Sequence, residues 1–405
     1  MYISSSYITI AVILLSFYVC LEGYLLVRAL GRVTGGGAGG SAGGKIRFRI
    51  YWPLSLLGAG LYFYFRYSSG ALRSLFSMVS SYWGLFLFVP FFIAADILIL
   101  GAFLFRRIFP RRRSARGTAA VSGVSSGVSG AASGAVYRLS VRLGVVVLAL
   151  VTLVAGSVAA RYTTFTSYSV TCEKPLPKKN LRIVLVSDLH IGSMVHKKEL
   201  KRIVSGINAL EGDIVLIAGD IIDRDMDAYK NENLNEEMSA IKAPLGVYAV
   251  PGNHDYFGGS PVELEKQLAA AGIRLLIDES VLVDNAFYVI GRNDLSVGRR
   301  GVRRKSLREL TGDLDTSLPL IVVDHQPVNL GEAEASGIDL QVSGHTHRGQ
   351  IWPGPIFTKR AYEDDYGLLY KGKTAVVVTS GCGTWGPPLR IGTKSEIVCI
   401  ELKNP

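Results

Sequence analysis

The 405-residue sequence contains few of the side chains that usually bind metals or form disulfides. It has six histidines and four cysteines. The cysteines lie far apart and without metal-type spacing, so they define neither a zinc-finger-like site nor a disulfide framework. The histidines, in contrast, are not scattered, because five of them lie in short motifs of similar composition. A metal site in this chain would therefore use imidazole and oxygen ligands.

Acidic residues are scarce in the first part of the chain. Residues 1–180 hold 19 Lys and Arg against 3 Asp and Glu, and residues 181–405 hold 25 against 30, so the net charges are +16 and −5, which add up to +11. A strongly basic balance is typical of proteins that bind nucleic acid or membranes. Here the basic excess flanks apolar segments and the C-terminal part is mildly acidic. We therefore expect no nucleic-acid partner.

Long apolar runs are present only before residue 161. Hydrophobic residues make up 49% of the chain and its mean hydropathy is +0.29, which predicts membrane segments. The second run has 16 residues with Pro53 inside, so whether it crosses the membrane stays open. A spanning helix needs about 20 mainly apolar residues. We predict an all-α membrane domain over residues 1–160 with about four transmembrane helices, at Tyr7–Leu30, Ile50–Phe65, Ser81–Phe105 and Leu143–Ala160.

The basic residues between these runs predict the orientation of the chain. Lys and Arg are enriched in cytoplasmic loops, and they are concentrated in the first and third loops, which also contain Gly- and Ser-rich tracts at 34–44 and 114–136. We therefore expect a multi-pass membrane protein, in contact with membrane lipids, whose residues after 160 lie outside the cytoplasm. Residues 161–179 are expected to be an extended tether, followed by a domain over 180–405. The absence of Asn-x-Ser/Thr from that domain favours a bacterial source and the cell membrane.

A run of β-branched and aliphatic residues followed by metal-competent side chains occurs five times after residue 180. Such runs predict buried strands, and the intervening helical patterns, such as His196–Leu210, predict a sheet core covered by helices. Binding sites in layered α/β sheets form where strands end. In an extended chain His345 and His347 would point to the same side and converge on one point. The clusters are Asp188 and His190; Asp220 and Asp223; Asn253, His254 and Asp255; His325; and His345 and His347.

The composition of these clusters favours a hydrolytic metal site over a structural one. Oxygen and imidazole ligands without cysteine suit Mn, Fe, Co or Zn. The clusters hold at least seven such residues, which are too many for one ion, so we predict two divalent ions that share a bridging carboxylate and a bridging water. Such a pair is the clamp used for in-line displacement at phosphorus.

The order of the motifs resembles the calcineurin-like metallophosphoesterase superfamily. Its signature is Asp-x-His, Gly-Asp-x-x-Asp, Gly-Asn-His-Asp/Glu, a lone His and Gly-His-x-His, and all five blocks occur here in order between residues 181 and 403. The wording GHTHRGQIWP at 344–353, with GTWGPPLRIG at 383–392, is most similar to the membrane-anchored phosphodiesterase branch. That branch includes transmembrane proteins with a metallophosphoesterase domain.

The resemblance implies a four-layer αββα sandwich and a division of labour within the site. Asp223 would steady a ligating imidazole, and a hydroxide that bridges the two metals would attack phosphorus. His254 would donate to the phosphoryl oxygen or leaving group, oriented by Asp255, unless it is only a structural neighbour. One ion would be held by Asp188, His190, Asp220 and His347, and the other by Asp220, Asn253, His325 and His345.

The substrate is less closely defined by the sequence. Asp255 and the Gly-His-x-His block point to hydrolysis of phosphodiesters, with pyrophosphates or monoesters as further options. Arg348 is a candidate contact for the phosphate. Trp352 either holds a lipid group of the substrate or packs its loop onto the sheet. The alternative function is a receptor domain that binds a phosphate ligand without turnover and signals through the membrane spans. No feature of the sequence indicates an oligomeric state.

Overall fold

The computed structural model describes residues 136, 140–141, 143–144, 147–148, 151–192, 195–223, 226–256, 261–386 and 388–405. The first three predicted membrane spans and the tract at 34–44 lie outside the described residues, as does the tract at 114–136 except for Val136. No helix within the described part is both long and apolar enough to cross a membrane. The chain divides into two compact units, Met1–Val154 and Ala155–Pro405, and both sheets lie in the second.

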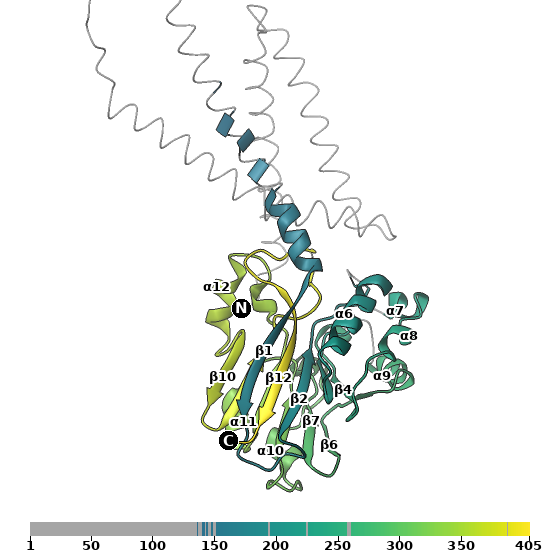
Figure 1. Cartoon of the computed structure of the whole chain (residues 1–405), viewed down its shortest axis with the longest axis vertical. Coiled ribbons are helices and arrows are strands. Elements are labelled where there is room, and N and C mark those ends of the chain that lie inside the picture. Colours follow the sequence, from purple (N-terminus) through teal and green to yellow (C-terminus); the bar gives the residue numbers. More distant parts are fainter. Residues whose placement is uncertain are drawn as a thin grey trace, which may run out of the picture. The chain divides into compact units, whose positions relative to one another are not determined.

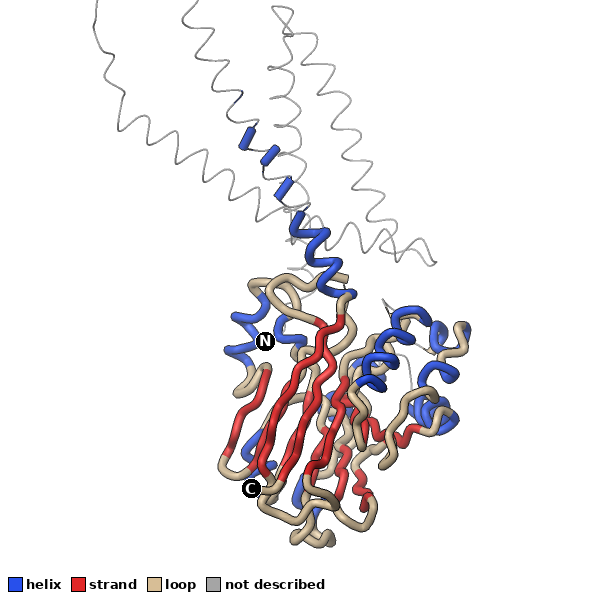
Figure 2. The backbone as a smooth tube through the Cα atoms, in the orientation of Figure 1, coloured by secondary structure: helices blue, strands red, loops and turns tan. Residues whose placement is uncertain are grey.

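Two six-stranded mixed sheets form the core of this unit (Figures 1 and 2). In the first sheet only the β12–β2 pair is antiparallel. In the second sheet only the edge pairs β10–β11 and β6–β7 are antiparallel. The first sheet has the order β1 (Thr163–Thr171), β12 (Ser395–Lys403), β2 (Asn180–Val186), β3 (Ile214–Ala218), β4 (Val247–Val250) and β5 (Ile273–Leu275). The second has the order β10 (Gly367–Lys371), β11 (Thr374–Val378), β9 (Leu340–Ser343), β8 (Leu320–Val323), β7 (Phe287–Gly291) and β6 (Glu279–Val283).

The sheets pack face to face, and helices cover their outer faces. Apolar side chains of both sheets, such as Leu216 and Val342, fill the space between them. Burial on two faces explains why the strands are continuous apolar runs. The two mixed α/β sheets expected from the resemblance are thus confirmed. The first sheet is covered by α6 (Lys197–Ala209), α7 (Asp227–Asn231), α8 (Asn235–Met238) and α9 (Pro261–Ala270). The second is covered by α10 (Leu307–Thr311) and α11 (Leu330–Ala335).

The five predicted clusters each follow the end of a strand. They follow β2, β3 and β4 of the first sheet and β8 and β9 of the second. Because β2, β3 and β4 run parallel, and so do β8 and β9, each set of strands ends at one edge of its sheet. The remaining elements after strand ends are η2 (His254–Tyr256), η3 (Leu295–Arg300), η4 (His347–Gly349) and α12 (Gly354–Ala361).

The segment at 161–179 differs from the predicted tether. Its chain is extended, but Thr163–Thr171 forms β1, which pairs in parallel with β12 over nine positions. The strand lies at the sheet edge, and only Val170 is buried, so its sequence lacks the apolar run that marks the central strands. Its partner lies more than 220 positions away in the chain. The folded domain therefore includes residues before 180.

Candidate metal centre

The predicted ligands lie on tight turns directly after the strands. Non-glycine residues rarely adopt the left-handed backbone conformation, which costs on the order of 1–3 kcal/mol and is often found at functional sites. The buried strands on either side hold the chain in this conformation. The turns also correct the expectation that His345 and His347 converge from an extended chain, because the two rings enter different groups. Positive φ angles occur at Asp188 (55°), His190 (49°), Asp220 (50°), His345 (69°) and His347 (48°).

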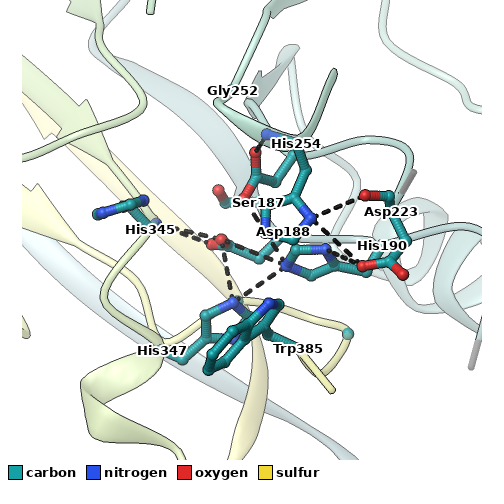
Figure 3. A network of polar contacts seen from close by, with 12 residues as sticks. Ser187, Asp188, His190, Asp223, Gly252, His254, His345, His347 and Trp385 are labelled. Carbon is teal, nitrogen blue, oxygen red and sulfur yellow. Dashed lines mark hydrogen bonds and ion pairs between the residues drawn. The ribbon is translucent and has the colours of Figure 1, made fainter. Parts of the chain in front are cut away.

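Asp188, His190 and His347 form the first group of ligand atoms (Figure 3). The Nε2 atoms of His190 and His347 lie 3.1 Å apart, and Asp188 Oδ1 lies 3.3 Å from His347 Nε2 and 4.0 Å from His190 Nε2. All three side chains are buried. Ligand atoms that share a tetrahedral ion at about 2.1 Å are roughly 3.4 Å apart. The group therefore has the dimensions of a metal site.

Asp220, Asn253, His325 and His345 form the second group. His325 Nε2 lies 3.3 Å from Asp220 Oδ2, 3.3 Å from Asn253 Oδ1 and 3.2 Å from His345 Nδ1. Asp220 Oδ2 also lies 3.7 Å from His190 Nε2 of the first group. One carboxylate oxygen thus lies between the two groups, where a bridging ligand is required.

The hydrogen bonds of His325 test whether the second group suits a cation. Its Nδ1 lies 2.8 Å from the carbonyl oxygen of Ala218, so this nitrogen carries a proton and donates. In the neutral ring Nε2 then has a lone pair, which faces the oxygens of Asp220 and Asn253. Such an outer hydrogen bond typically fixes the tautomer of a metal-binding histidine. The converging acceptors fit a bound cation.

Close backbone approach around the site requires glycine. A Cβ atom on Gly252 would collide with Asp220 Oδ1, and one on Gly344 would collide with the Ser187 hydroxyl and lie 2.5 Å from Asp188 Oδ2. The glycines of the Gly-Asn-His-Asp and Gly-His-x-His motifs are therefore required because any side chain there would collide with the neighbouring residues.

His254 and Asp223 lie beside the first group (Figure 3). His254 Nδ1 lies 2.8 Å from the Asp223 carbonyl oxygen and 3.3 Å from its Oδ1, which is also 3.4 Å from His190 Nδ1. The predicted contact of Asp223 with a candidate ligand is therefore present.

The position of Asp255 differs from the expectation that it orients His254. Its buried carboxylate accepts backbone N–H groups of Gly252 at 2.7 Å, Ile222 at 2.9 Å and Ile221 at 3.3 Å. These bonds fasten the loop after β4 to the loop after β3. The His254 ring is held by Asp223, and Asp255 shapes the loop that carries it. Asp255 follows His254 directly in the sequence, and this spacing is compatible both with orienting the His254 ring and with holding its loop.

Burial and mutual charge set the protonation of the cluster. Burial by itself would raise the pKa of Asp220, yet His325 and then His190 hold that pKa well below its usual range. Burial and the charge of His325 lower the pKa of His345 to about 4. Burial, with His190 and Arg390, also lowers the pKa of His347 well below its ordinary value. Neutral imidazoles and an ionised carboxylate are the forms that bind metals, so Asp220, His345 and His347 are in such forms. The pKa of His325 differs: burial would lower it, but the charges of Asp220 and Asp188 raise it well above its ordinary value.

The electrostatics of His254 differ from those of His345 and His347. Burial alone would lower its pKa, but the hydrogen bond to Asp223 and the charge of Asp220 raise the pKa above its ordinary value. The ring is thereby biased towards the protonated form, in which both nitrogens donate.

Arg390 was not identified from the sequence. Its side chain is 1% exposed, and Nη2 donates to the carbonyl oxygens of Ser380 and Gly383, each at 2.7 Å. The same nitrogen lies 3.5 Å from His347 Nδ1. The guanidinium thus fastens the 380–383 loop behind a predicted ligand. Its segment, LRIG, carries no ligand pattern, so only the fold brings it to the site.

Asp294 is a second residue that was missed. It is fully buried, and its carboxylate accepts from Gln326 Nε2 at 2.9 and 3.2 Å. Gln326 follows His325, so this contact steadies the turn that carries a predicted ligand. Asp294 lies shortly after β7, and this placement of an acid after an apolar run was an available signal.

The two predicted substrate contacts follow His347 closely in the chain. The Arg348 guanidinium lies over the Tyr366 ring, 4.2 Å from its centroid. Trp352 is 64% exposed, so the alternative in which its side chain packs the loop onto the sheet is not supported.

The fold and the clustered ligands define a class of protein, a metallophosphoesterase-type domain. A family model for calcineurin-like phosphoesterase matches residues 181–349. An uncharacterized metallophosphoesterase of Aquifex aeolicus is 32% identical over 243 residues, which cover 58% of this chain and 90% of that protein. The chain belongs to the calcineurin-like phosphoesterase family. Members of this family use two divalent metal ions, and the clustered His and Asp residues provide candidate ligands for them.

Other relatives are longer than the matched region. An uncharacterized metallophosphoesterase of Campylobacter jejuni is 34% identical over 238 residues, or 58% of this chain and 63% of that protein. A Danio rerio relative named transmembrane protein with metallophosphoesterase domain is 32% identical over 241 residues, or 57% of this chain and 55% of its own. The chain covers 60–63% of the length of the first three relatives compared. A dimetal phosphatase structure from Danio rerio aligns with 14% identity and a TM-score of 0.32, covering 49% of this chain and 86% of that one.

Proposed function

We propose that the chain is a membrane-tethered phosphoesterase that hydrolyses phosphodiesters at a centre of two metal ions. The observation that carries this proposal is the position of Asp220 Oδ2, 3.7 Å from His190 Nε2 and 3.3 Å from His325 Nε2. One ion would be held by Asp188, His190, Asp220 and His347, and the other by Asp220, Asn253, His325 and His345. When bound, two such ions polarise the phosphoryl group and lower the pKa of a water molecule.

The residues of the chain itself supply orientation and proton transfer. Asp223 accepts from His254 Nδ1 and fixes the ring, so that Nε2 of the protonated ring can donate to a phosphoryl or leaving-group oxygen. The raised pKa of His254, caused by its contacts with Asp223 and Asp220 against the effect of burial, supports this role. Asp255 would act indirectly, by holding the loop that carries His254.

The proposed preference for diesters rests on the sequences of the motifs and on the residues around the site. Asp255 ends its block as in the phosphodiesterase branch, and Arg348, over the Tyr366 ring, is proposed as a phosphate contact. The exposed Trp352 is proposed to meet an apolar, lipid-like group of the substrate. Pyrophosphates and monoesters are the competing substrate classes.

Membrane tethering is supported by the four apolar runs before residue 161 and by relatives named transmembrane proteins. The proposed arrangement has a membrane domain over 1–160 and a catalytic domain outside the cytoplasm of a bacterial cell. The proposed tether is shorter than the predicted segment 161–179, because β1 is part of the first sheet.

The test compares substrates and metals on the purified full chain. Hydrolysis of bis-p-nitrophenyl phosphate and p-nitrophenyl phosphate is measured after removal of metals and reloading with Mn, Fe, Co or Zn. We expect the diester to be turned over with the higher kcat/KM, and Asp220→Asn to lower turnover of both substrates. A chain that binds two ions yet hydrolyses neither ester nor any pyrophosphate would contradict the proposal and favour the receptor alternative.

A further inference from the structure

Large apolar side chains are exposed beside the metal centre. Trp352 is 64%, Phe357 64%, Trp385 51% and Ile356 45% exposed, and α12 has no buried residue at all. Single exposed apolar residues are ordinary on protein surfaces, whereas a group of them marks an interaction surface. We call Trp352, Ile356, Phe357 and Trp385 the apolar rim.

Hydrogen bonds hold the rim together as a fixed surface. The Gln350 side chain bonds to both backbone groups of Trp385, each at 2.8 Å. Two residues further on, Trp352 N–H donates to Ile391 O at 2.8 Å. Gly349 and Gly354 lie in backbone contact too close for a Cβ atom on either residue, which ties α12 to η4. The hydrogen bonds and backbone contacts of these segments therefore hold the rim side chains in their exposed positions.

The rim adjoins the segment through which the chain enters this domain. Arg390 N–H donates to Gly156 O at 3.0 Å, and a Cβ atom on Gly156 would meet Ile391 at 3.1 Å. Figure 1 shows α12 at the end of the sheets where the helix preceding β1 arrives. That helix ends at residue 161, directly after the uncharged run Leu143–Ala160. The run has 18 residues, against the roughly 20 mainly apolar residues of a spanning helix, and its last turns lie against the folded domain at Gly156.

The charges next to the rim match an anionic surface. Lys359 and Arg360 are exposed in the last turn of α12, beside Ile356 and Phe357. Tryptophan favours the membrane–water interface, and short helices with apolar and basic faces lie in that interface.

We propose that the apolar rim, with Lys359 and Arg360, docks onto the anionic bilayer that carries the preceding segment. This inference rests on the membrane tether proposed above but not on catalysis. Docking would hold the metal centre at the headgroup level, because Gln350 is three residues from His347 and Tyr362, just after α12, has its ring 6.1 Å from that of His345. Substrates with phosphate at the bilayer surface would then reach the ions directly.

The test uses tryptophan fluorescence of the full chain in nanodiscs that hold one copy each. The four tryptophans are Trp52, Trp83, Trp352 and Trp385. In the Trp52→Phe, Trp83→Phe background only the two rim tryptophans report. We expect their emission to be blue-shifted and quenched by lipids brominated near the headgroup, and Lys359→Glu with Arg360→Glu to reduce that quenching in anionic nanodiscs.

A matched reporter serves as the control. Tyr370, on β10, is 50% exposed, and Figure 1 shows β10 running away from α12. With all four native tryptophans replaced by Phe, a Tyr370→Trp reporter should remain unquenched. Equal quenching of the rim tryptophans and of the Tyr370→Trp reporter would overturn rim docking, and so would unquenched rim tryptophans. A blue shift seen only in discs that hold two copies would also overturn it. Extraction of the chain from membranes by alkaline carbonate would overturn the tether and the docking together. Neither readout depends on hydrolysis.

Discussion

At the scale of residues, neighbouring side chains of the metal centre are proposed to have different tasks. Asp220 lies between two groups of ligand atoms, whereas His254 lies beside one of them and is held by Asp223. A residue that binds both ions and a residue that transfers a proton should fail in different ways when replaced.

Replacement of Asp220 and His254 separates these tasks. Asp220→Asn should lower both the metal content and the activity, since the bridging oxygen loses its charge. His254→Ala should lower kcat by about 10²–10⁴ and leave both ions bound, because it removes only proton transfer or transition-state hydrogen bonding. The measurement is metal analysis by mass spectrometry alongside steady-state kinetics. Equal metal loss in both variants would contradict the assignment of roles.

The buried carboxylate of Glu396 provides a pH test away from the metals. It accepts from Thr166 Oγ1 at 2.6 Å, Ser380 N at 3.0 Å and Tyr366 Oη at 3.1 Å. Burial alone would raise its pKa, but these bonds and Lys394 hold the pKa below its ordinary value. Stability from this group is therefore full above the unfolded pKa, about 4.3, and is lost as the pH falls through the folded pKa.

Glu396→Gln should lower the free energy of unfolding by about 2 kcal/mol at pH 7, because the amide offers a donor where donors already converge. The deficit should begin to shrink below the unfolded pKa of about 4.3 and shrink further as the pH falls through the lower folded pKa, where the native carboxylate becomes protonated too. This difference in the free energy of unfolding is measured by thermal unfolding of the metal-free chain in detergent between pH 3 and 7. A deficit that is constant over this range would show that the charge of Glu396 makes no contribution.

At the scale of elements, β1 decides where the folded domain begins. Its parallel pairing with β12 buries Val170 and brings Thr166 to Glu396. Without it, β12 becomes an unprotected sheet edge, which favours aggregation.

Two fragments of the chain test this boundary. A fragment that begins at Thr163 should be soluble and unfold cooperatively, whereas one that begins at Asn180 should unfold at least roughly 5 °C lower or aggregate. Differential scanning fluorimetry and light scattering on the two fragments provide the measurement. Equal melting temperatures would mean that β1 is an accessory strand.

The sequence was sufficient to predict the elements that carry the candidate ligands. Asp188, Asp220 and His345 each follow a continuous apolar run, and such runs become central strands because both of their faces are buried. It was insufficient for β1, whose exposed edge position needs no apolar run. It was also insufficient for Arg390, because a loop from the end of the chain brings this residue to His347 without any local pattern.

At the scale of the whole molecule, the proposed topology places the metal centre outside the cytoplasm. The basic loops before residue 161 carry this inference, since Lys and Arg are retained on the cytoplasmic side. The apolar rim would then face the outer leaflet.

Reporter fusions test this topology. An alkaline phosphatase fused after Pro405 should be active in intact bacteria, and a green fluorescent protein inserted within 114–136 should fluoresce, because folding of these reporters depends on the compartment. Expression controls by immunoblot exclude differences in amount. The reverse pattern would place the catalytic domain in the cytoplasm.

The central claim is a phosphodiesterase centre of two ions, and a metal titration of the full chain tests it most directly. Bis-p-nitrophenyl phosphate hydrolysis is followed while the metal-free chain receives Mn²⁺, and bound metal is measured in parallel. Since both ions would act on the same phosphoryl group, we predict that activity remains low up to one bound ion and rises to its full value with the second. Full activity with one ion, or no hydrolysis with two, would contradict the account.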